Sequence, residues 1–478
     1  MRYRNLLLLL SDEHAGSVLG CAGHPVVRTP NLDALAARSV RFTAAYTNSP
    51  ICIPARAALA SGRWASDIGA WDNAFAYAGQ PPGWAHALRA AGRRTAAIGK
   101  MHFRDARCDA GFDEQIQAMH VVDGTGDLLG CVRDPPPVRH KSRAVATEIG
   151  PGESSYTVYD RAVTDAACAW LDRHGAGAPW ALQVGWVAPH FPLVAPPDCY
   201  ALYDAQSIPP PKASRPGQWP DHPWLDALRN SFVTDRFHTD ATRRVALASY
   251  YALISAMDRQ LGRVLAALQA SGAAQDTLVI YTSDHGDNMG ARGLWGKSTM
   301  YEESAGIPLL LHGPGLASGV ARMPVTLVDV AATLVDAAGI EVDSGWRGES
   351  LLRLTRGQVQ DDKRCAFSEY HAAGSPSAAY MLRCGDWKYV HYVGMAPQLF
   401  DLAGDPEELH DRAAEADQQP RLARFERLLR ERVDPEALDR RAKVDQAALL
   451  ARHGGRDAVV ARGGFGATPP PGESARFS

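Results

Sequence analysis

The segment that decides the fold is residues 5–14, NLLLLLSDEH, in which a short apolar run ends abruptly in polar residues. Five leucines are too few for the apolar region of a secretory signal, and no small-residue cleavage site follows them. A short, continuous apolar run of this kind is typical of a strand that is buried on both faces of a sheet. We therefore expect Asn5–Leu10 to form the first strand, with Asp12 just beyond its carboxyl end.

Apolar runs that resemble strands alternate with helical patterns along the rest of the chain. The further expected strands are residues 95–98, 180–187 and 277–282. The expected helices are residues 31–39, with Asn31 as the cap, residues 243–269, which carry the longest apolar stripe, and residues 419–433. This alternation predicts an α/β fold, with a large mixed, mostly parallel sheet flanked by helices. Ligands gather beyond the carboxyl ends of strands in such sheets, so Asp12 and Asp284 are expected to meet in space.

The chain has 478 residues, which is longer than most single domains. We expect a large α/β domain over residues 1–363, a smaller C-terminal α+β domain over residues 364–462 and an extended tail over residues 463–478. The tail is rich in Gly and Pro and could pack on a partner subunit, so we expect a homo-oligomer, either a dimer or a tetramer. Two proline-rich or glycine-rich loops, residues 124–153 and 196–224, are expected near the substrate entrance.

Composition excludes several classes of function. The formal net charge of -3 gives no basic excess for binding nucleic acid, and no apolar stretch approaches the roughly 20 residues that span a membrane. Eight cysteines are scattered without a CxxC pair or another framework spacing. They are expected to be reduced, mostly buried thiols in a cytoplasmic protein.

The most specific motif is ICIPAR, residues 51–56, which is preceded by TPNLDAL at residues 29–35 and followed by SGR at residues 61–63. A lone cysteine is more often a small buried apolar residue than a reactive one. Together, however, these motifs resemble the opening of the sulfatase family within the alkaline phosphatase superfamily. In that family a separate activating enzyme oxidises the cysteine of CxPxR to formylglycine. Ala55 replaces the commoner Ser, while the Cys, Pro and Arg of the signal are retained.

The resemblance implies a metal-bound nucleophile derived from Cys52. One hydroxyl of an aldehyde hydrate can be activated by a divalent cation, and the second hydroxyl can then expel sulfate. The implied metal ligands are Asp12, the modified Cys52, Asp284 and His285, while ligation by Glu13 stays open. Carboxylate oxygens suit Ca²⁺, and the imidazole makes Mn²⁺ the alternative.

Further motifs resemble catalytic segments of the same family. Lys100 and His102, in GKMHF, are implied to bind a sulfate oxygen and to hydrogen-bond the hydrate. His190, in the segment PHF, is the implied proton donor to the leaving oxygen, and Lys297, in GLWGK, is the second sulfate-binding lysine. Arg56 is implied to orient the hydrate.

The segment WDNA at residues 71–74, together with the DH pair and GLWxK, resembles the branch that contains choline-sulfatases and phosphonate monoester hydrolases. This resemblance implies an alkaline-phosphatase-like fold and assigns Asn73 to substrate binding. Trp186, Phe191 and Trp295 could form an aromatic wall around a cationic substrate such as choline.

The leading hypothesis is a sulfuric ester hydrolase that cleaves a small organosulfate and that matures with a formylglycine-generating enzyme. Hydrolysis of phosphonate monoesters or phosphodiesters by the same site is the first alternative. A member of the fold that binds anions without catalysis is a further alternative, although it would be expected to lose Cys52, Arg56, Lys100 and Lys297. The last alternative is an unmodified thiol at position 52 that acts as the nucleophile.

Overall fold

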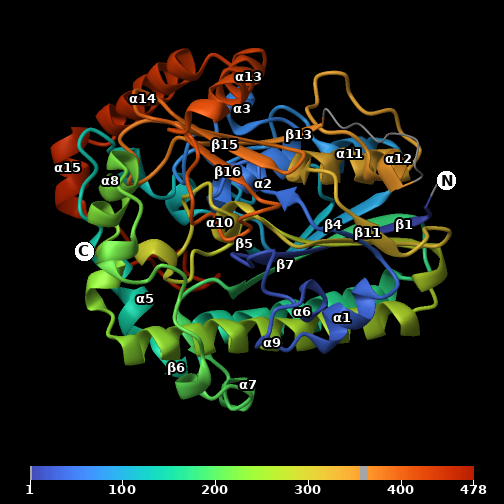
Figure 1. Ribbon diagram of the computed structural model, residues 1–478. Coiled ribbons are helices and arrows are strands. Elements are labelled where there is room, and N and C mark those ends of the chain that lie inside the picture. The colour runs from blue at the N-terminus through green and yellow to red at the C-terminus, as the bar shows by residue number, and fades with distance from the viewer. Residues whose placement is uncertain (1–2, 356–363, 478) are drawn as a thin grey trace.

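The computed structural model describes residues 3–355 and 364–477 (Figure 1). Within the described residues the largest sheet has eight strands. Their spatial order is β11 (Gly319–Ala321), β2 (Val40–Phe42), β10 (Leu309–His312), β9 (Thr277–Ser283), β1 (Asn5–Asp12), β7 (Trp180–Pro189), β4 (Arg94–Lys100) and β5 (Glu114–Met119). Strand β10 runs antiparallel to both of its neighbours, and the other adjacent pairs are parallel. The expected mixed, mostly parallel α/β sheet is confirmed.

Strand β1 lies in the interior of this sheet and is buried along its whole length. Leu6, Leu8 and Leu10 belong to one apolar core, and Leu7 and Leu9 belong to the core on the opposite face. Side chains alternate between the two faces of a strand, so an unbroken leucine run supplies both cores at once. Each fully buried leucine contributes roughly 1.5–3 kcal/mol of transfer free energy.

Helices cover both faces of the sheet (Figure 1). The helices of one layer are α1 (Pro30–Ala36), α6 (Ser155–His174) and α9 (Asp240–Ala270). The helices of the other layer are α2 (Cys52–Ser61), α4 (Trp84–Ala90), α11 (Leu327–Ala337) and α12 (Leu351–Thr355). Helix α9 extends the expected helix by three residues at its N-terminus, where the Thr239 hydroxyl accepts a hydrogen bond from the Thr242 N–H. No helix in the described part of the chain is both long and apolar enough to cross a membrane.

The expected cap of the first helix is wrong by two residues. Helix α1 begins at Pro30, so Thr29 occupies the cap position and Asn31 lies inside the first turn. Proline suits the first helical position because its missing N–H would have no partner there. The side-chain amide and the backbone N–H of Asn31 both donate to Oδ2 of Asp258 on α9, at 2.8 and 3.1 Å. Asn31 therefore ties two helices together.

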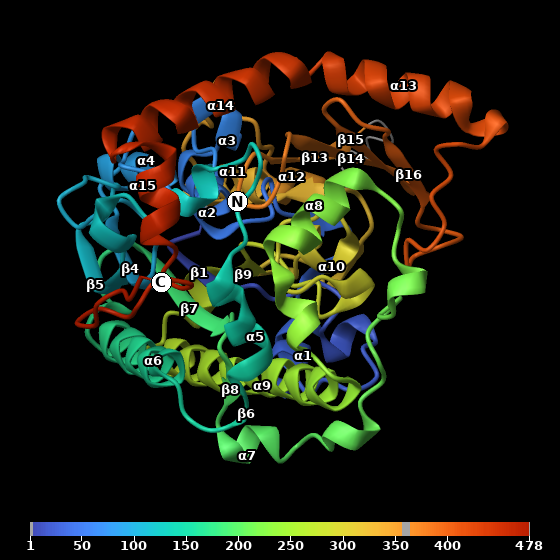
Figure 2. The same cartoon turned by 90° about the vertical axis from the view of Figure 1, so that its left-hand side faces the viewer.

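A second sheet, which is antiparallel, is formed by residues after position 363. Residue 363 is the expected end of the first domain, and it lies outside the described residues. The strands of this sheet are β13 (Cys365–Tyr370), β14 (Ala379–Cys384), β15 (Trp387–Tyr392) and β16 (Gln398–Asp401). The helices that follow are α13 (Gln419–Arg430), α14 (Pro435–Arg452) and α15 (Gly455–Arg462), and α13 and α14 run across the top of the molecule (Figure 2). Helix α14 returns to the N-terminal part of the chain, where the side-chain amide of Gln446 donates a hydrogen bond to Asp72 at 2.6 Å.

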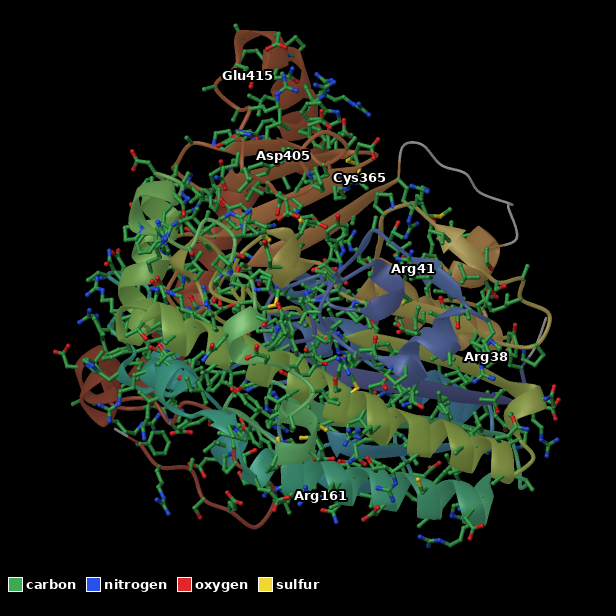
Figure 3. All side chains as sticks on the ribbon, turned by 60° about the horizontal axis from the view of Figure 1, so that its bottom comes forward. Arg38, Arg41, Arg161, Cys365, Asp405 and Glu415 are labelled. Carbon is green, nitrogen blue, oxygen red and sulfur yellow. A yellow bond between two sulfur atoms is a disulfide. The ribbon has the colours of Figure 1, made fainter. Side chains whose placement is uncertain are left out.

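The expectation that all cysteines are reduced is wrong. Cys365 and Cys384 form a disulfide on the C-terminal sheet, where Cys365 is labelled in Figure 3. The two residues are directly opposite one another in the β13–β14 pair, with their Cα atoms 4.3 Å apart. Antiparallel pairing thus brings together residues that are 19 positions apart in sequence. Disulfides are rare in cytosolic proteins, so the cysteines no longer support a cytoplasmic location.

The disulfide can be tested by counting thiols. Denatured wild-type protein that has not been reduced should present six reactive thiols when Cys52 is unmodified. The Cys52→Ala variant, treated in the same way, should present one thiol fewer. Cys384→Ser should also lower the free energy of unfolding by roughly 3 kcal/mol, because the bond closes a short loop in the unfolded chain. Cys168→Ser, at a half-buried free thiol, is the matched control. Eight reactive thiols in the unreduced wild-type chain would contradict the assignment.

Candidate metal centre and catalytic pocket

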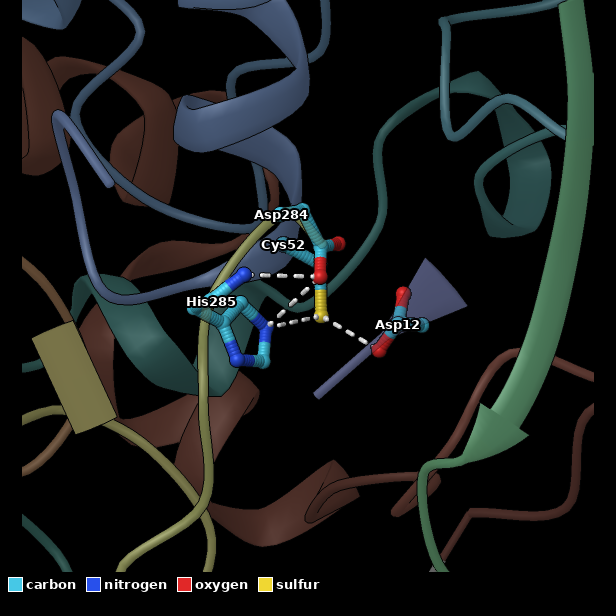
Figure 4. Close-up of side chains that lie close together, drawn as sticks. All are labelled: Asp12, Cys52, Asp284 and His285. Atoms are coloured by element: carbon cyan, nitrogen blue, oxygen red, sulfur yellow. Dashed lines mark hydrogen bonds and ion pairs between the residues drawn. The ribbon is translucent and has the colours of Figure 1, made fainter. Parts of the chain in front are cut away.

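Strand pairing brings the expected metal ligands together. Strand β1 ends at Asp12, and Asp284 and His285 follow β9, which pairs in parallel with β1 up to the register pair Ser11–Ser283. Cys52 reaches the same point from the start of α2. One ligand atom from each of these four residues lies within 4.8 Å of the other three, and all four side chains are buried (Figure 4).

Cys52 is the first residue of α2, where backbone N–H groups lack helical partners and favour a negative charge. Its Sγ lies 3.2 Å from Nε2 of His285, 3.1 Å from Nζ of Lys297 and 3.7 Å from Oδ1 of Asp12. Burial, with the carboxylate of Asp12, raises the pKa of the Cys52 thiol to about 12. The protein groups around it therefore keep the thiol protonated near neutral pH.

Arg56, one helical turn after Cys52, joins the two carboxylates. Its Nε donates to Oδ2 of Asp284 at 2.7 Å, and its Nη2 donates to Oδ2 of Asp12 at 2.9 Å. Nζ of Lys100 also lies 2.7 Å from Oδ2 of Asp12. Burial opposes ionisation of Asp12, but Lys100 and Arg56 outweigh it and hold the pKa of Asp12 well below its usual range. Both cations use Oδ2, so Oδ1 of Asp12 remains directed toward Cys52.

The hydrogen bonds of His285 suit metal ligation. Its Nδ1 lies 2.9 Å from the carbonyl oxygen of Gly286, so Nδ1 carries the proton and donates a hydrogen bond to that oxygen. The Nε2 lone pair is then free to face Cys52. Oδ1 of Asp284 is held by the backbone N–H groups of Glu13 and His285, at 3.2 and 2.9 Å. Two carboxylates and an oriented imidazole form a donor set that fits a divalent cation such as Ca²⁺ or Mn²⁺.

Glu13, whose role the sequence left open, lies beside this cluster. Its Oε2 is 3.2 Å from Nζ of Lys297 and 3.4 Å from Nε2 of His190, whereas its buried Oε1 has no hydrogen-bond partner among the described residues. Burial raises the pKa of Glu13 to about 7. Asp12, Glu13 and His190 form a second group in which one ligand atom of each residue lies within 4.8 Å of the others.

Lys297, His102 and His190 line a pocket that opens beside Cys52. Burial lowers the pKa of both histidines well below the usual value, and the nearby lysines lower it further. Nδ1 of His190 lies 2.7 Å from the carbonyl oxygen of Phe191, which fixes the ring, while both ring nitrogens of His102 lack partners in the described structure. His102 has a φ of 55°, in the left-handed region, and such strain often marks a functional site.

Asn73 lies on the pocket wall and also supports α2. Its Oδ1 accepts a hydrogen bond from the backbone N–H of Ile53 at 3.1 Å. Ile53 is the second residue of α2, whose N–H has no helical partner. Asn73 therefore fixes the orientation of the helix turn that carries Cys52.

The tail packs on its own chain. Residues 464–468 line the pocket, and the hydroxyl of Tyr156 on α6 donates to the carbonyl oxygen of Thr468 at 2.5 Å. The 124–153 loop also contributes to the lining, whereas residues 196–224 do not. The tail therefore forms a wall of the pocket of its own chain. The expected homo-oligomer stays a prediction.

Several pocket residues were missed by the sequence analysis. The missed side chains that line the pocket include Arg139, Lys141, Phe232, Thr234 and Phe465. Only the position of the first two in a loop expected near the entrance could have indicated them. The proposed aromatic wall is partly wrong: Phe191 and Trp295 line the pocket, but Trp186 is fully buried and donates from Nε1 to Oγ1 of Thr164 at 2.9 Å.

Asn73→Ala should lower the melting temperature by about 2 °C, because loss of a cap acceptor costs about 1 kcal/mol. Asn73→Asp keeps an acceptor for the Ile53 N–H and should melt close to the wild-type chain. Differential scanning calorimetry of the three proteins checks this. Equal melting of wild type and Asn73→Ala would show that the contact does not stabilise α2.

Comparison with known proteins assigns the family. Residues 4–340 match the Sulfatase family, and residues 290–434 match the family described as N-sulphoglucosamine sulphohydrolase, C-terminal. The chain is 33% identical over 460 residues to a choline-sulfatase of Rhizobium meliloti (strain 1021), covering 93% of this chain and 89% of that protein. It is 30% identical over 438 residues to arylsulfatase K of Homo sapiens, covering 85% and 78%.

The crystal structure of the phosphonate monoester hydrolase of Agrobacterium radiobacter superposes with a TM-score of 0.74 at 25% identity, covering 92% of this chain and 96% of that chain. The alkaline-phosphatase-like fold expected from the motifs is confirmed. The family match covers well over half of the chain and includes every residue of the metal cluster. The chain therefore belongs to the sulfatase family, the sulfuric ester hydrolases of the alkaline phosphatase superfamily.

Proposed function

We propose that this enzyme hydrolyses the sulfate ester of a small organic molecule, with a formylglycine derived from Cys52 as its nucleophile. The observation that carries the proposal is the convergence of Asp12, Asp284 and His285 on Sγ of Cys52 at the inner end of the pocket. Oxidation of Cys52 would supply an aldehyde hydrate, and a divalent cation, Ca²⁺ or alternatively Mn²⁺, would lower the pKa of the attacking hydroxyl.

The remaining polar residues of the pocket have separate roles in this proposal. Lys297, 3.1 Å from Sγ of Cys52, is positioned to neutralise a sulfate oxygen. Lys100 and His102 line the same pocket and would bind the other side of the anion. Donors fixed before the reaction usually contribute the largest share of catalysis, at about 3 kcal/mol each. Arg56, paired with two carboxylates, holds position 52 and the metal ligands in register.

His190 is the proposed proton donor to the leaving oxygen. Its Nδ1 is engaged with the Phe191 carbonyl, so Nε2 is the nitrogen available for proton transfer. The low pKa of His190 means that the ring is neutral in the free enzyme near pH 7. Glu13, whose carboxyl lies 3.4 Å from Nε2, is the nearest group that could supply the proton.

Burial of Cys52 bears on its maturation. The residue is 1% exposed and lies within the first turn of α2, so an activating enzyme cannot reach its side chain in the folded chain. We propose that a formylglycine-generating enzyme acts before the fold closes. The raised pKa of the Cys52 thiol argues against the alternative in which an unmodified thiolate attacks sulfur.

Phosphonate monoester or phosphodiester hydrolysis is the second candidate function. The likeness in fold to a phosphonate monoester hydrolase favours it, and both substrates are tetrahedral anions that the same cationic pocket could hold. The higher sequence identity is to a choline-sulfatase, which favours sulfate esters. The intact set of lysines and metal ligands disfavours a non-catalytic member of the fold.

Chain produced together with a formylglycine-generating enzyme should hydrolyse an aryl sulfate, and mass spectrometry of the tryptic peptide 42–56 should show an aldehyde in place of the thiol. Cys52→Ala should abolish hydrolysis, whereas Cys21→Ala, at a free cysteine outside the pocket, should not alter it. Chelation should remove activity, and Ca²⁺ or Mn²⁺ should restore it. Full activity with an unaltered thiol would contradict the formylglycine proposal. A phosphonate monoester hydrolysed orders of magnitude faster than the sulfate would favour the second candidate.

Deletion of residues 464–478 should raise the KM for an aryl sulfate by about tenfold, because the substrate ring would lose roughly 1.5 kcal/mol of apolar contact with the tail. The contacts near Cys52 stay in place, so kcat should change much less. Steady-state kinetics checks this. Val460→Ala, at an exposed residue of α15 that does not line the pocket, is the control. An unchanged KM in the longer deletion would show that the tail does not contact substrate.

A further inference from the structure

The outer part of the pocket combines apolar surface with two basic side chains. The apolar residues that line it include Leu129, Val145, Phe232 and Phe465. Two residues of the 124–153 loop with long cationic side chains, Arg139 and Lys141, line this wall of the pocket. The acidic residue of the same loop that lines the pocket is Asp127. The charges of these three side chains therefore sum to a positive value, whereas the whole chain carries a net charge of -3.

Arg139 is held in place but is only partly paired. Its side chain is 12% exposed, and one guanidinium nitrogen, Nη2, forms an ion pair with Asp127. Its backbone N–H donates to the carbonyl oxygen of Ser231 at 2.9 Å, and its Cζ lies 5.4 Å from the centroid of the Phe232 ring. The other terminal nitrogen, Nη1, is buried and has no hydrogen-bond partner among residues 3–355 and 364–477. A buried guanidinium N–H without an acceptor is uncommon and needs an explanation.

Lys141 supplies the second positive charge. A Cβ placed on Gly466 would lie 3.4 Å from Cβ of Lys141 and 4.0 Å from its Cδ, so the lysine stem runs along the tail. Its ammonium group forms no ion pair within the described part of the chain. The tail segment and the 124–153 loop therefore meet at this side chain, on the pocket wall.

We infer that the alcohol part of the substrate carries a second anionic group, a carboxylate or a second sulfate, which binds Arg139 and Lys141 while an apolar ring contacts the phenylalanines. This inference rests on the proposed sulfate ester hydrolysis. A guanidinium with a free N–H is a strong donor to an anionic oxygen. A quaternary ammonium substrate would meet two cations on this wall, and Asp127, the carboxylate of the same loop, is already paired. The pocket therefore differs in specificity from what the name of the choline-sulfatase relative would suggest.

The test compares four sulfate esters on the matured, metal-loaded enzyme. These are 3-(sulfooxy)benzoate, its neutral methyl ester, the disulfate of resorcinol and choline-O-sulfate. We expect kcat/KM for the benzoate or the disulfate to exceed that for the methyl ester by at least about tenfold, which is the effect of one hydrogen bond to a charged group. The two anionic esters distinguish a carboxylate site from a site for a second sulfate. Choline-O-sulfate should be the poorest of the four.

Two variants and one control locate the effect. Arg139→Gln and Lys141→Met should each reduce the preference for the anionic ester over the methyl ester by roughly 10-fold to 100-fold, mainly through KM. Arg143→Gln, an exposed arginine of the same segment that does not line the pocket, should leave the preference unchanged. Melting temperatures of all three variants identify any loss of folding, and Lys141→Met keeps the test valid if Arg139→Gln unfolds.

Equal rates for the benzoate and its methyl ester in the wild-type enzyme, or fastest hydrolysis of choline-O-sulfate, would overturn the inference. So would an Arg139→Gln variant that lowers kcat/KM for both esters equally. Calorimetric binding of the two esters to Cys52→Ala gives the same comparison without turnover. If no sulfate ester is hydrolysed but phosphonate monoesters are, the proposed function fails, and the paired esters in the binding assay still decide whether this wall selects an anion.

Discussion

Parallel pairing of β1 with β9 is the constraint on which the site depends. The register places Ser11 opposite Ser283, so Asp12 and Asp284 leave adjacent strand ends side by side. Two buried carboxylates would repel one another, and Arg56 offsets that repulsion by donating to both. Because Arg56 is on the same helix as Cys52, this bridge also sets the position of Cys52, the proposed nucleophile. A single arginine thus couples the sheet, the helix and the candidate metal ligands.

In the carboxylates of the site, individual oxygen atoms have their own partners. Lys100 and Arg56 both occupy Oδ2 of Asp12, which leaves Oδ1 for the cluster around Cys52. Backbone N–H groups of Glu13 and His285 similarly hold Oδ1 of Asp284. The carboxylates are therefore oriented by the protein before any cation binds, and preorganisation of this kind reduces the cost of binding and catalysis.

The walls of the pocket come from segments with little regular structure. The 124–153 loop and residues 464–468 line its outer part, whereas the strand ends and α2 form its floor. In the proposed function, the chemistry therefore takes place at the ends of buried strands, and the leaving group is selected by segments that can vary without disturbing the core. The disulfide links two strands of the C-terminal sheet, and the buried contact of Gln446 with Asp72 joins α14 to the segment that carries Asn73 on the pocket wall.

The sequence by itself determined the sheet class and the family, and it named the residues of the candidate metal cluster that the fold brings together. The leucine run of 5–14 predicts a strand buried on both faces, and the CxPxR motif is specific enough to identify the relatives. These signals are local, because strand periodicity and a short motif involve residues that are neighbours in the chain.

The tertiary structure alone decided the features that depend on distant contacts. These are the disulfide, the contact of Asn31 with Asp258, the burial of Trp186 in the core and the path of the tail over its own pocket. The unpaired nitrogen of Arg139 belongs to the same group, because it depends on where Asp127 and Ser231 lie. The sequence has no period or motif for these contacts, since each joins elements whose relative position is fixed only by packing of the whole fold.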